Sequence, residues 1–118
     1  MQDNIKPEKV YGMTGEQFVK LCHEEKEAML SRYFEDSAET LVGDKIKALY
    51  KKDVSKKELS ELINSVLEES FYTLLMGIEG EASLGGVQNA YKLYDEEGNL
   101  LNEFGEIEAA AFEYFMEK

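Results

Sequence analysis

The spacing of apolar residues predicts a helix near the start of the chain. Thr14 and Gln17 form a capping box, in which a hydroxyl and an amide side chain satisfy backbone N–H groups at a helix start. The apolar residues between Phe18 and Tyr33 then recur at intervals that place them on one helical face. Residues 1–12 show no such pattern, and we expect them to form a loosely ordered lead-in.

Two further helices are predicted in the middle of the chain. Ser37 is the predicted cap of the first, although Gly43 weakens its opening turns and favours a start at Asp44. The second has the clearest pattern in the sequence, because Ser55 and Glu58 form another capping box ahead of a long apolar stripe. The stripe consists of Leu59, Leu62, Ile63, Val66, Leu67, Phe71 and Leu74. We therefore expect this helix to be the central element of the core.

Glycines at four positions from residue 77 to residue 86 end the helical pattern. The segment Asp95–Gly98 then has Asp at the first and Gly at the last position of a type I turn, which is typical of a short hairpin. We predict a β-hairpin of Gln88–Tyr94 and Asn99–Glu103. Taken alone, Val87–Tyr94 has a spacing that also suits a helix.

A final helix over Glu106–Glu117 completes the predicted fold. Its expected buried stripe consists of Ile107, Ala110, Ala111, Tyr114 and Phe115. The predicted fold class is mainly α (α+β), with three N-terminal helices, one β-hairpin and a C-terminal helix. With 118 residues and 43% hydrophobic composition, the chain is expected to form a single domain over residues 1–118.

Charge is distributed unevenly along the chain. Met1–Lys57 carries eleven acidic and eleven basic side chains, whereas Glu58–Lys118 carries fourteen acidic side chains and two lysines. The formal net charge of −12 therefore falls entirely in the second part. Such a field repels phosphate backbones, so we expect no direct binding of nucleic acid.

Composition narrows the class of protein further. The sequence has no apolar run long enough to cross a membrane and no signal-peptide pattern at its start. Cys22 is the only cysteine, so no internal disulfide can form. A reducing, cytoplasmic setting is therefore expected, without membrane association.

Residues that can support catalysis or metal binding do not form a recognisable motif. His23 is the only histidine, and the position four residues later, where zinc proteases have a second histidine, is Glu27. We interpret His23 as a surface residue on a helix flank. A nucleophilic cysteine needs a nearby base, but Cys22 and His23 are neighbours in a helix and do not face each other, so we interpret Cys22 as a small core residue. We expect neither a cofactor nor a metal, and an enzyme is the least favoured class of function.

Two loop segments suggest weaker ligand hypotheses. Gly77–Gly86 superficially resembles a phosphate-binding loop, but Glu79 and Glu81 would repel a phosphate. In the acidic turn, Asp95, Glu97 and Asn99 occupy every second position, as calcium ligands do in a calcium-binding loop. The glycine of this turn, however, is at the wrong position for such a loop. Weak binding of a divalent cation by this turn stays open as an alternative.

Two main functional hypotheses follow. The favoured one is a small acidic protein-binding inhibitor, similar in physical type to bacterial immunity proteins and antitoxins, that neutralises a basic partner such as a nuclease toxin. Clustered carboxylates speed association with such a partner. The alternative is a helical adaptor or a self-associating subunit of a larger assembly, including a homodimer. It would use the apolar Phe71–Ile78 end of the long helix.

The candidate partner-binding residues are those where tyrosines adjoin carboxylates, because tyrosines often supply anchor area at interfaces. They are Tyr91, Tyr94, Asp95, Glu96, Glu97, Glu103, Glu106 and Glu108. For each tyrosine, the competing interpretation is that it packs the hairpin onto the helices.

Overall fold

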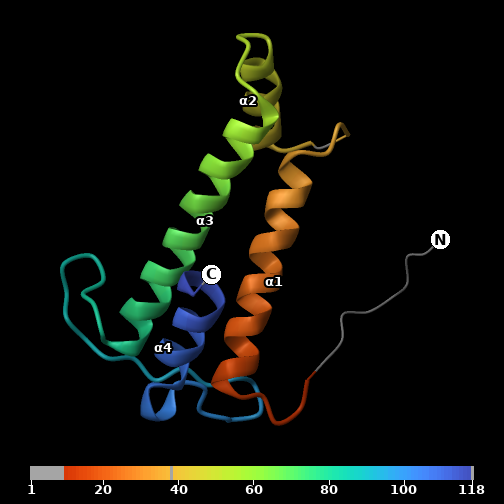
Figure 1. The fold of residues 1–118 in the computed structure, drawn as a ribbon. Helices are drawn as coiled ribbons and strands as arrows, with labels where there is room; N and C mark the ends of the chain where they lie inside the picture. The colour runs from red at the N-terminus through yellow and green to blue at the C-terminus, as the bar shows by residue number, and fades with distance from the viewer. Residues whose placement is uncertain (1–9, 38, 118) are drawn as a thin grey trace.

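The computed structural model describes residues 10–37 and 39–117, and these are mainly helical. The elements are α1 (Gly15–Tyr33), α2 (Leu41–Tyr50), α3 (Lys56–Glu79), a 3-10 turn η1 (Glu103–Gly105), α4 (Glu106–Ala111) and a π-helical turn η2 (Phe112–Met116). α1 and α3 run in opposite directions, with α4 between them at one end and α2 at the other (Figure 1). Within this described part, no helix combines the length and apolar character needed to cross a bilayer. Of the predicted lead-in, residues 1–9 lie outside the described residues.

Local capping signals set the starts of the two long helices, as predicted. Thr14 Oγ1 accepts a hydrogen bond from Gln17 N at 3.1 Å, and Gln17 Oε1 accepts one from Thr14 N at 3.0 Å. Ser55 and Glu58 form the same reciprocal pair at the start of α3. Each pair satisfies two N–H groups that the helix itself leaves without partners.

The predicted cap of α2 was wrong. Thr40, not Ser37, is the N-cap, and its Oγ1 accepts a hydrogen bond from Gly43 N at 2.9 Å. α2 therefore begins at Leu41, ahead of the expected start at Asp44. Gly43 is buried within the first turn and does not delay the start of the helix.

The apolar core lies where α1, α3 and α4 meet. Its buried residues are Val19, Leu75, Met76, Leu101, Ile107, Ala110, Ala111 and Phe115. The stripe predicted for the last helix is confirmed, with Tyr114 half-buried beside it. The central position predicted for α3 was wrong, because α4 and η2 lie between the long helices and only one side of α3 faces them. Leu62, Val66 and Leu74 of the predicted α3 stripe are 61%, 54% and 51% exposed.

A buried lysine joins α1 to α3 outside the apolar core. The Lys26 side chain is 1% exposed, and its Nζ donates to Asn64 Oδ1 at 2.8 Å and to Glu68 Oε2 at 3.3 Å. Glu27 Oε2 accepts a third hydrogen bond from the same Nζ at 2.5 Å. Lys26 follows Val19 by about two helical turns, so it continues the buried line of α1.

The predicted β-hairpin was wrong. The described residues contain no strand, and the only pairings among them are the isolated bridges Leu84–Val87 and Tyr94–Leu100. The predicted turn does form, because Gly98 N donates to Asp95 O at 3.1 Å. The segment before it, residues 87–94, is neither a strand nor a helix.

The side chain of Asn102 explains why the ladder stops after one bridge. Its Oδ1 accepts a hydrogen bond from Leu93 N at 2.9 Å, and its Nδ2 donates to Tyr91 O at 2.5 Å. These are groups that a return strand would otherwise pair with its own backbone. The loop instead joins α3, where Tyr91 N donates to Ile78 O at 3.1 Å near the helix end.

Candidate protein-binding site

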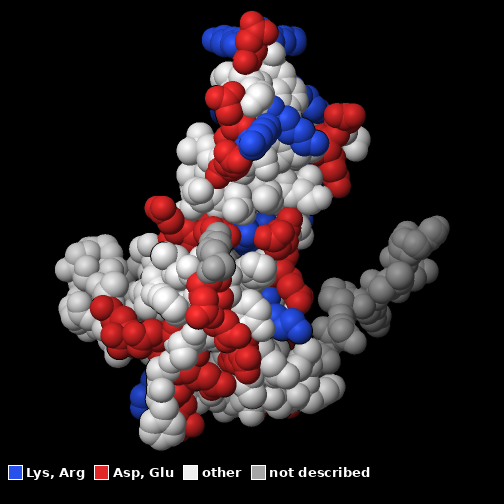
Figure 2. Space-filling view, viewed as in Figure 1, with Lys and Arg blue, Asp and Glu red and all other residues white. Residues whose placement is uncertain are grey.

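Carboxylates gather around the outward side of α4. In Figure 2 acidic side chains form a column over α4, between α1 and α3, whereas basic and acidic side chains are mixed at the opposite end of the molecule, around α2. Two shallow hollows flank the exposed Ala109, one on each side of the helix. We call this surface the α4 face; it comprises Ala109, Phe112 and Glu113, with Glu16 and Glu106 on one flank and Tyr72, Phe104 and Glu108 on the other.

The flank towards α1 is acidic. Its hollow, of about 280 Å³, is lined by Glu16, Glu106, Ala109, Ala110 and Glu113. Glu106 Oε2 lies 3.4 Å from Glu16 N, which donates to it at the start of α1. The dipole of α1 favours negative charge at this point, so Glu106 both stabilises the helix start and adds charge to the surface.

Gly15 permits this close approach of α1 to the segment before α4. A Cβ atom at Gly15 would lie 2.0 Å from the carbonyl oxygen of Leu101 and 3.1 Å from the side chain of Glu106. Any larger residue would therefore move α1 away from Leu101. The acidic flank depends on a backbone contact between parts of the chain that are far apart in the sequence.

The flank towards α3 is more apolar. Its hollow, of about 490 Å³, is lined by Tyr72, Phe104, Gly105, Glu108, Ala109 and Phe112. Phe104 is 97% exposed and has a left-handed backbone with φ of 53°, which a bulky side chain disfavours. Glu79 Oε2 accepts a hydrogen bond from Glu108 N at 3.0 Å and so caps the start of α4.

The structure places two of the predicted partner-binding residues on the α4 face. These are Glu106 and Glu108, and the exposed Glu103 precedes Phe104 in η1. Tyr91 and Tyr94 are 40% and 54% exposed in the loop that leads there. The competing interpretation, that these tyrosines pack this segment onto the helices, stays open, because Tyr91 N donates to Ile78 O of α3.

The remaining predicted residues belong to the turn at Asp95–Gly98. The Asp95 carboxylate accepts hydrogen bonds from Asn99 Nδ2 at 3.0 Å and from the backbone N–H groups of Asn99 and Glu97 at 2.8 and 3.0 Å. These bonds, led by the one from the Asn99 side chain, lower the pKa of Asp95. Asp95 therefore shapes the turn, and Glu96 and Glu97 are exposed at its tip.

Six residues of the α4 face were not predicted from the sequence. They are Glu16, Tyr72, Phe104, Ala109, Phe112 and Glu113. The exposure of Phe112 could have been predicted from the sequence, because this residue is apolar yet falls outside the buried stripe of the last helix. The place of Glu16 on this face could not have been predicted, because Glu16 lies 90 residues before the Glu106 side chain that it contacts.

The residues considered for catalysis or metal binding have packing roles. The His23 ring lies 5.7 Å from the Tyr114 ring and 5.4 Å from the Phe115 ring, so it is closer to the core than predicted. Cys22 packs against the core, as predicted, and burial raises the pKa of its thiol. Across residues 10–37 and 39–117, no three His, Cys, Asp or Glu side chains come together in a metal-binding arrangement.

Comparisons with protein-family models, with curated proteins and with solved structures found no match.

Proposed function

We propose that this chain is a small acidic protein-binding inhibitor, of the immunity or antitoxin type, that neutralises a basic partner such as a nuclease toxin. The observation that carries the proposal is the α4 face. Carboxylates of Glu16, Glu106 and Glu113, which come from both α1 and the last helix, surround a small exposed alanine there. They lie beside a hollow lined by aromatic rings.

The two flanks of the α4 face have complementary roles in this proposal. Clustered carboxylates attract and orient a basic protein, and they match a cationic site that otherwise holds phosphate groups. Phe104 and Phe112 supply exposed aromatic area, and aromatic residues are enriched at the cores of protein interfaces. Tyr91, Tyr94 and the acidic turn at Asp95–Glu97 extend this surface as a second candidate contact.

Charge reversal at the α4 face tests the proposal. The variant Glu103→Lys with Glu113→Lys changes one exposed carboxylate next to this face, beside Phe104, and one on it, so far-UV circular dichroism is expected to stay unchanged. Its association rate with a basic protein captured from a lysate of the source cells is expected to fall about tenfold at low salt. Surface plasmon resonance measures the rate.

Two further variants separate local from global charge effects. Glu24→Lys with Glu61→Lys produces the same change in net charge at exposed positions of α1 and α3, and it is expected to slow association much less. Equal slowing by both double variants would contradict a specific role for the α4 face. Glu96→Lys with Glu97→Lys reports separately on the acidic turn, and an effect confined to that variant would move the binding surface there.

A further inference from the structure

The hollow on the α3 side of the α4 face combines aromatic rings with a carboxylate. Tyr72 packs against the core and is half-buried, whereas Phe104 and Phe112 are 97% and 52% exposed. Aromatic rings attract cations over their faces, because the π electrons make the faces negative. The remaining lining residues are Gly105, Glu108 and Ala109, so the lining includes no basic side chain.

The carboxylate of Glu108 is available to a ligand in this hollow. It has no ion pair or hydrogen bond with any residue that the structure describes. A Cβ atom at Gly105 would lie 3.7 Å from Glu108 Oε1 and 4.0 Å from Glu79 Oε2, so two carboxylates border the hollow at this point. Glu79 already caps α4. An apolar occupant would cover the Glu108 carboxylate without pairing it, which is costly, so the hollow favours a cation.

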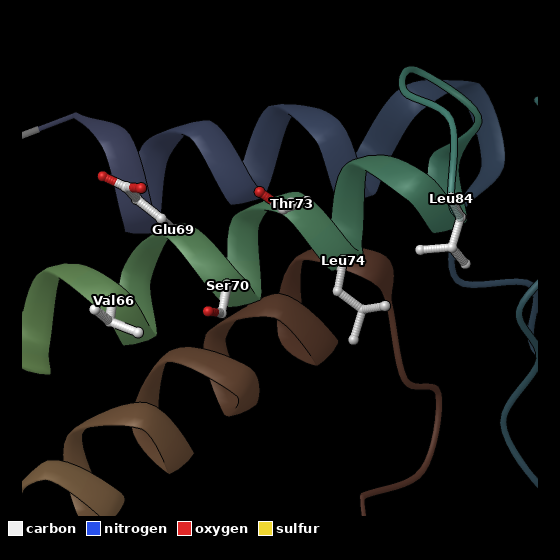
Figure 3. Close-up of a pocket in the computed structure, with 6 residues that line it drawn as sticks. All are labelled: Val66, Glu69, Ser70, Thr73, Leu74 and Leu84. Atoms are coloured by element: carbon white, nitrogen blue, oxygen red, sulfur yellow. The ribbon is translucent and has the colours of Figure 1, made fainter. Parts of the chain in front are cut away.

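The other large hollow on α3 lacks this combination. It has a volume of about 420 Å³, and none of the described residues that line it is aromatic. Figure 3 shows that its one carboxylate, Glu69, points away from the edge of α3 that carries Val66 and Leu74. Nothing in this hollow selects a cation over an apolar group, and Glu69 therefore provides a matched control position.

We propose that the aromatic hollow of the α4 face binds an arginine side chain of the basic partner. A planar guanidinium can stack on aromatic rings and at the same time donate two hydrogen bonds to the Glu108 carboxylate. The compact, strongly hydrated ammonium of lysine is less suited to both contacts. The assignment rests on the proposed function, because it takes the arginine from the basic partner. Arginine also binds phosphate in cationic sites, so holding it here would block such a site.

A titration with a single side chain tests the hollow directly. The full chain, labelled with ¹⁵N, is titrated with N-acetyl-arginine amide at constant ionic strength and followed by two-dimensional NMR. Saturable shifts are expected at the N–H groups of Gly105, Ala109 and Phe112, with a dissociation constant of about 1–10 mM. N-acetyl-lysine amide has the same charge and is expected to bind about threefold more weakly. Shifts that do not saturate, or equal binding of the two probes, would overturn the assignment.

Three variants locate the binding. Glu108→Gln is expected to weaken binding of the arginine probe about fivefold, because it removes the paired charge. Phe112→Leu keeps an apolar side chain but removes a ring, and it is expected to weaken binding about threefold. Glu69→Gln removes the same charge at an exposed position in the other hollow and is expected to leave binding unchanged. Equal weakening by Glu69→Gln and Glu108→Gln would contradict the assignment, and the same spectra show that each variant is folded.

The probe requires no natural partner, so this assignment and the proposed function can fail separately. If charge reversal at Glu103 and Glu113 slows association with the basic partner but the arginine probe does not bind, the arginine assignment is wrong and the proposed function stands. If the probe binds as expected but charge reversal leaves association unchanged, the guanidinium site stands and the proposed function is wrong.

Discussion

At the scale of single residues, Phe104 is the clearest sign that the α4 face was not shaped by folding alone. Its ring is 97% exposed, so it contributes little apolar burial, and its left-handed backbone is unfavourable for a bulky residue. Asn adopts this conformation far more readily. This combination of an exposed ring and a disfavoured backbone supports the proposal that Phe104 contacts a partner.

Replacing Phe104 by Asn is therefore expected to stabilise the fold by about 1 kcal/mol. Urea denaturation measures the change. The same substitution at Phe112, which is 52% exposed and has right-handed helical geometry, is expected to destabilise, because it loses partial burial and helix propensity. If Phe104→Asn lowers stability by as much as Phe112→Asn, the backbone of Phe104 is not strained.

At the scale of elements, the contact between α1 and α3 depends on a polar cluster outside the apolar core. Lys26 is 1% exposed, and its main partner of opposite charge on α3, Glu68, has a side chain that is 13% exposed. Asn64 provides a further acceptor from α3. Removing one member of a buried charged pair leaves the other without compensation, which is costly in low-dielectric surroundings.

Lys26→Ala is accordingly expected to destabilise the fold by about 3 kcal/mol, measured as the free energy of unfolding in urea. Lys20→Ala removes an exposed lysine from the same helix and is expected to change stability by less than about 0.5 kcal/mol. Similar losses for the two variants would show that the Lys26 cluster contributes nothing specific.

The elements also show which parts of the fold could be predicted from the sequence alone. The starts of α1 and α3 were predictable because the capping pairs Thr14–Gln17 and Ser55–Glu58 are local. The exposure of Leu62, Val66 and Leu74 on α3 could not be predicted in this way. α3 is apolar on more than one side, and the position of α4 decides which side is buried. The predicted hairpin was wrong for a similar reason. The side chain of Asn102, and not the backbone of a second strand, forms hydrogen bonds with Leu93 N and Tyr91 O.

The candidate site was only partly predictable for the same physical reason. Glu106 and Glu108 could be named because acidic residues concentrate in the second part of the sequence. Glu16 joins them only because Gly15 lets α1 approach Leu101. Long-range backbone contact of this kind leaves no local pattern in the sequence.

At the scale of the whole molecule, carboxylates dominate one end of the long helices. They gather over α4, whereas basic and acidic side chains are mixed around α2 at the other end (Figure 2). In the proposed function, the carboxylates over α4 orient an approaching basic protein towards the α4 face before contact. Salt screens such steering over distances of about 10 Å, so its contribution falls as ionic strength rises.

The most direct test of the central claim is the salt dependence of association with a basic partner captured from the source cells. Stopped-flow or biosensor measurements give the association rate at increasing concentrations of sodium chloride. Electrostatic steering by the α4 face predicts a fall of about tenfold or more from low to high salt, with a much smaller change in the dissociation rate. An association rate that does not change with salt, or a captured partner that is itself acidic, would contradict the account.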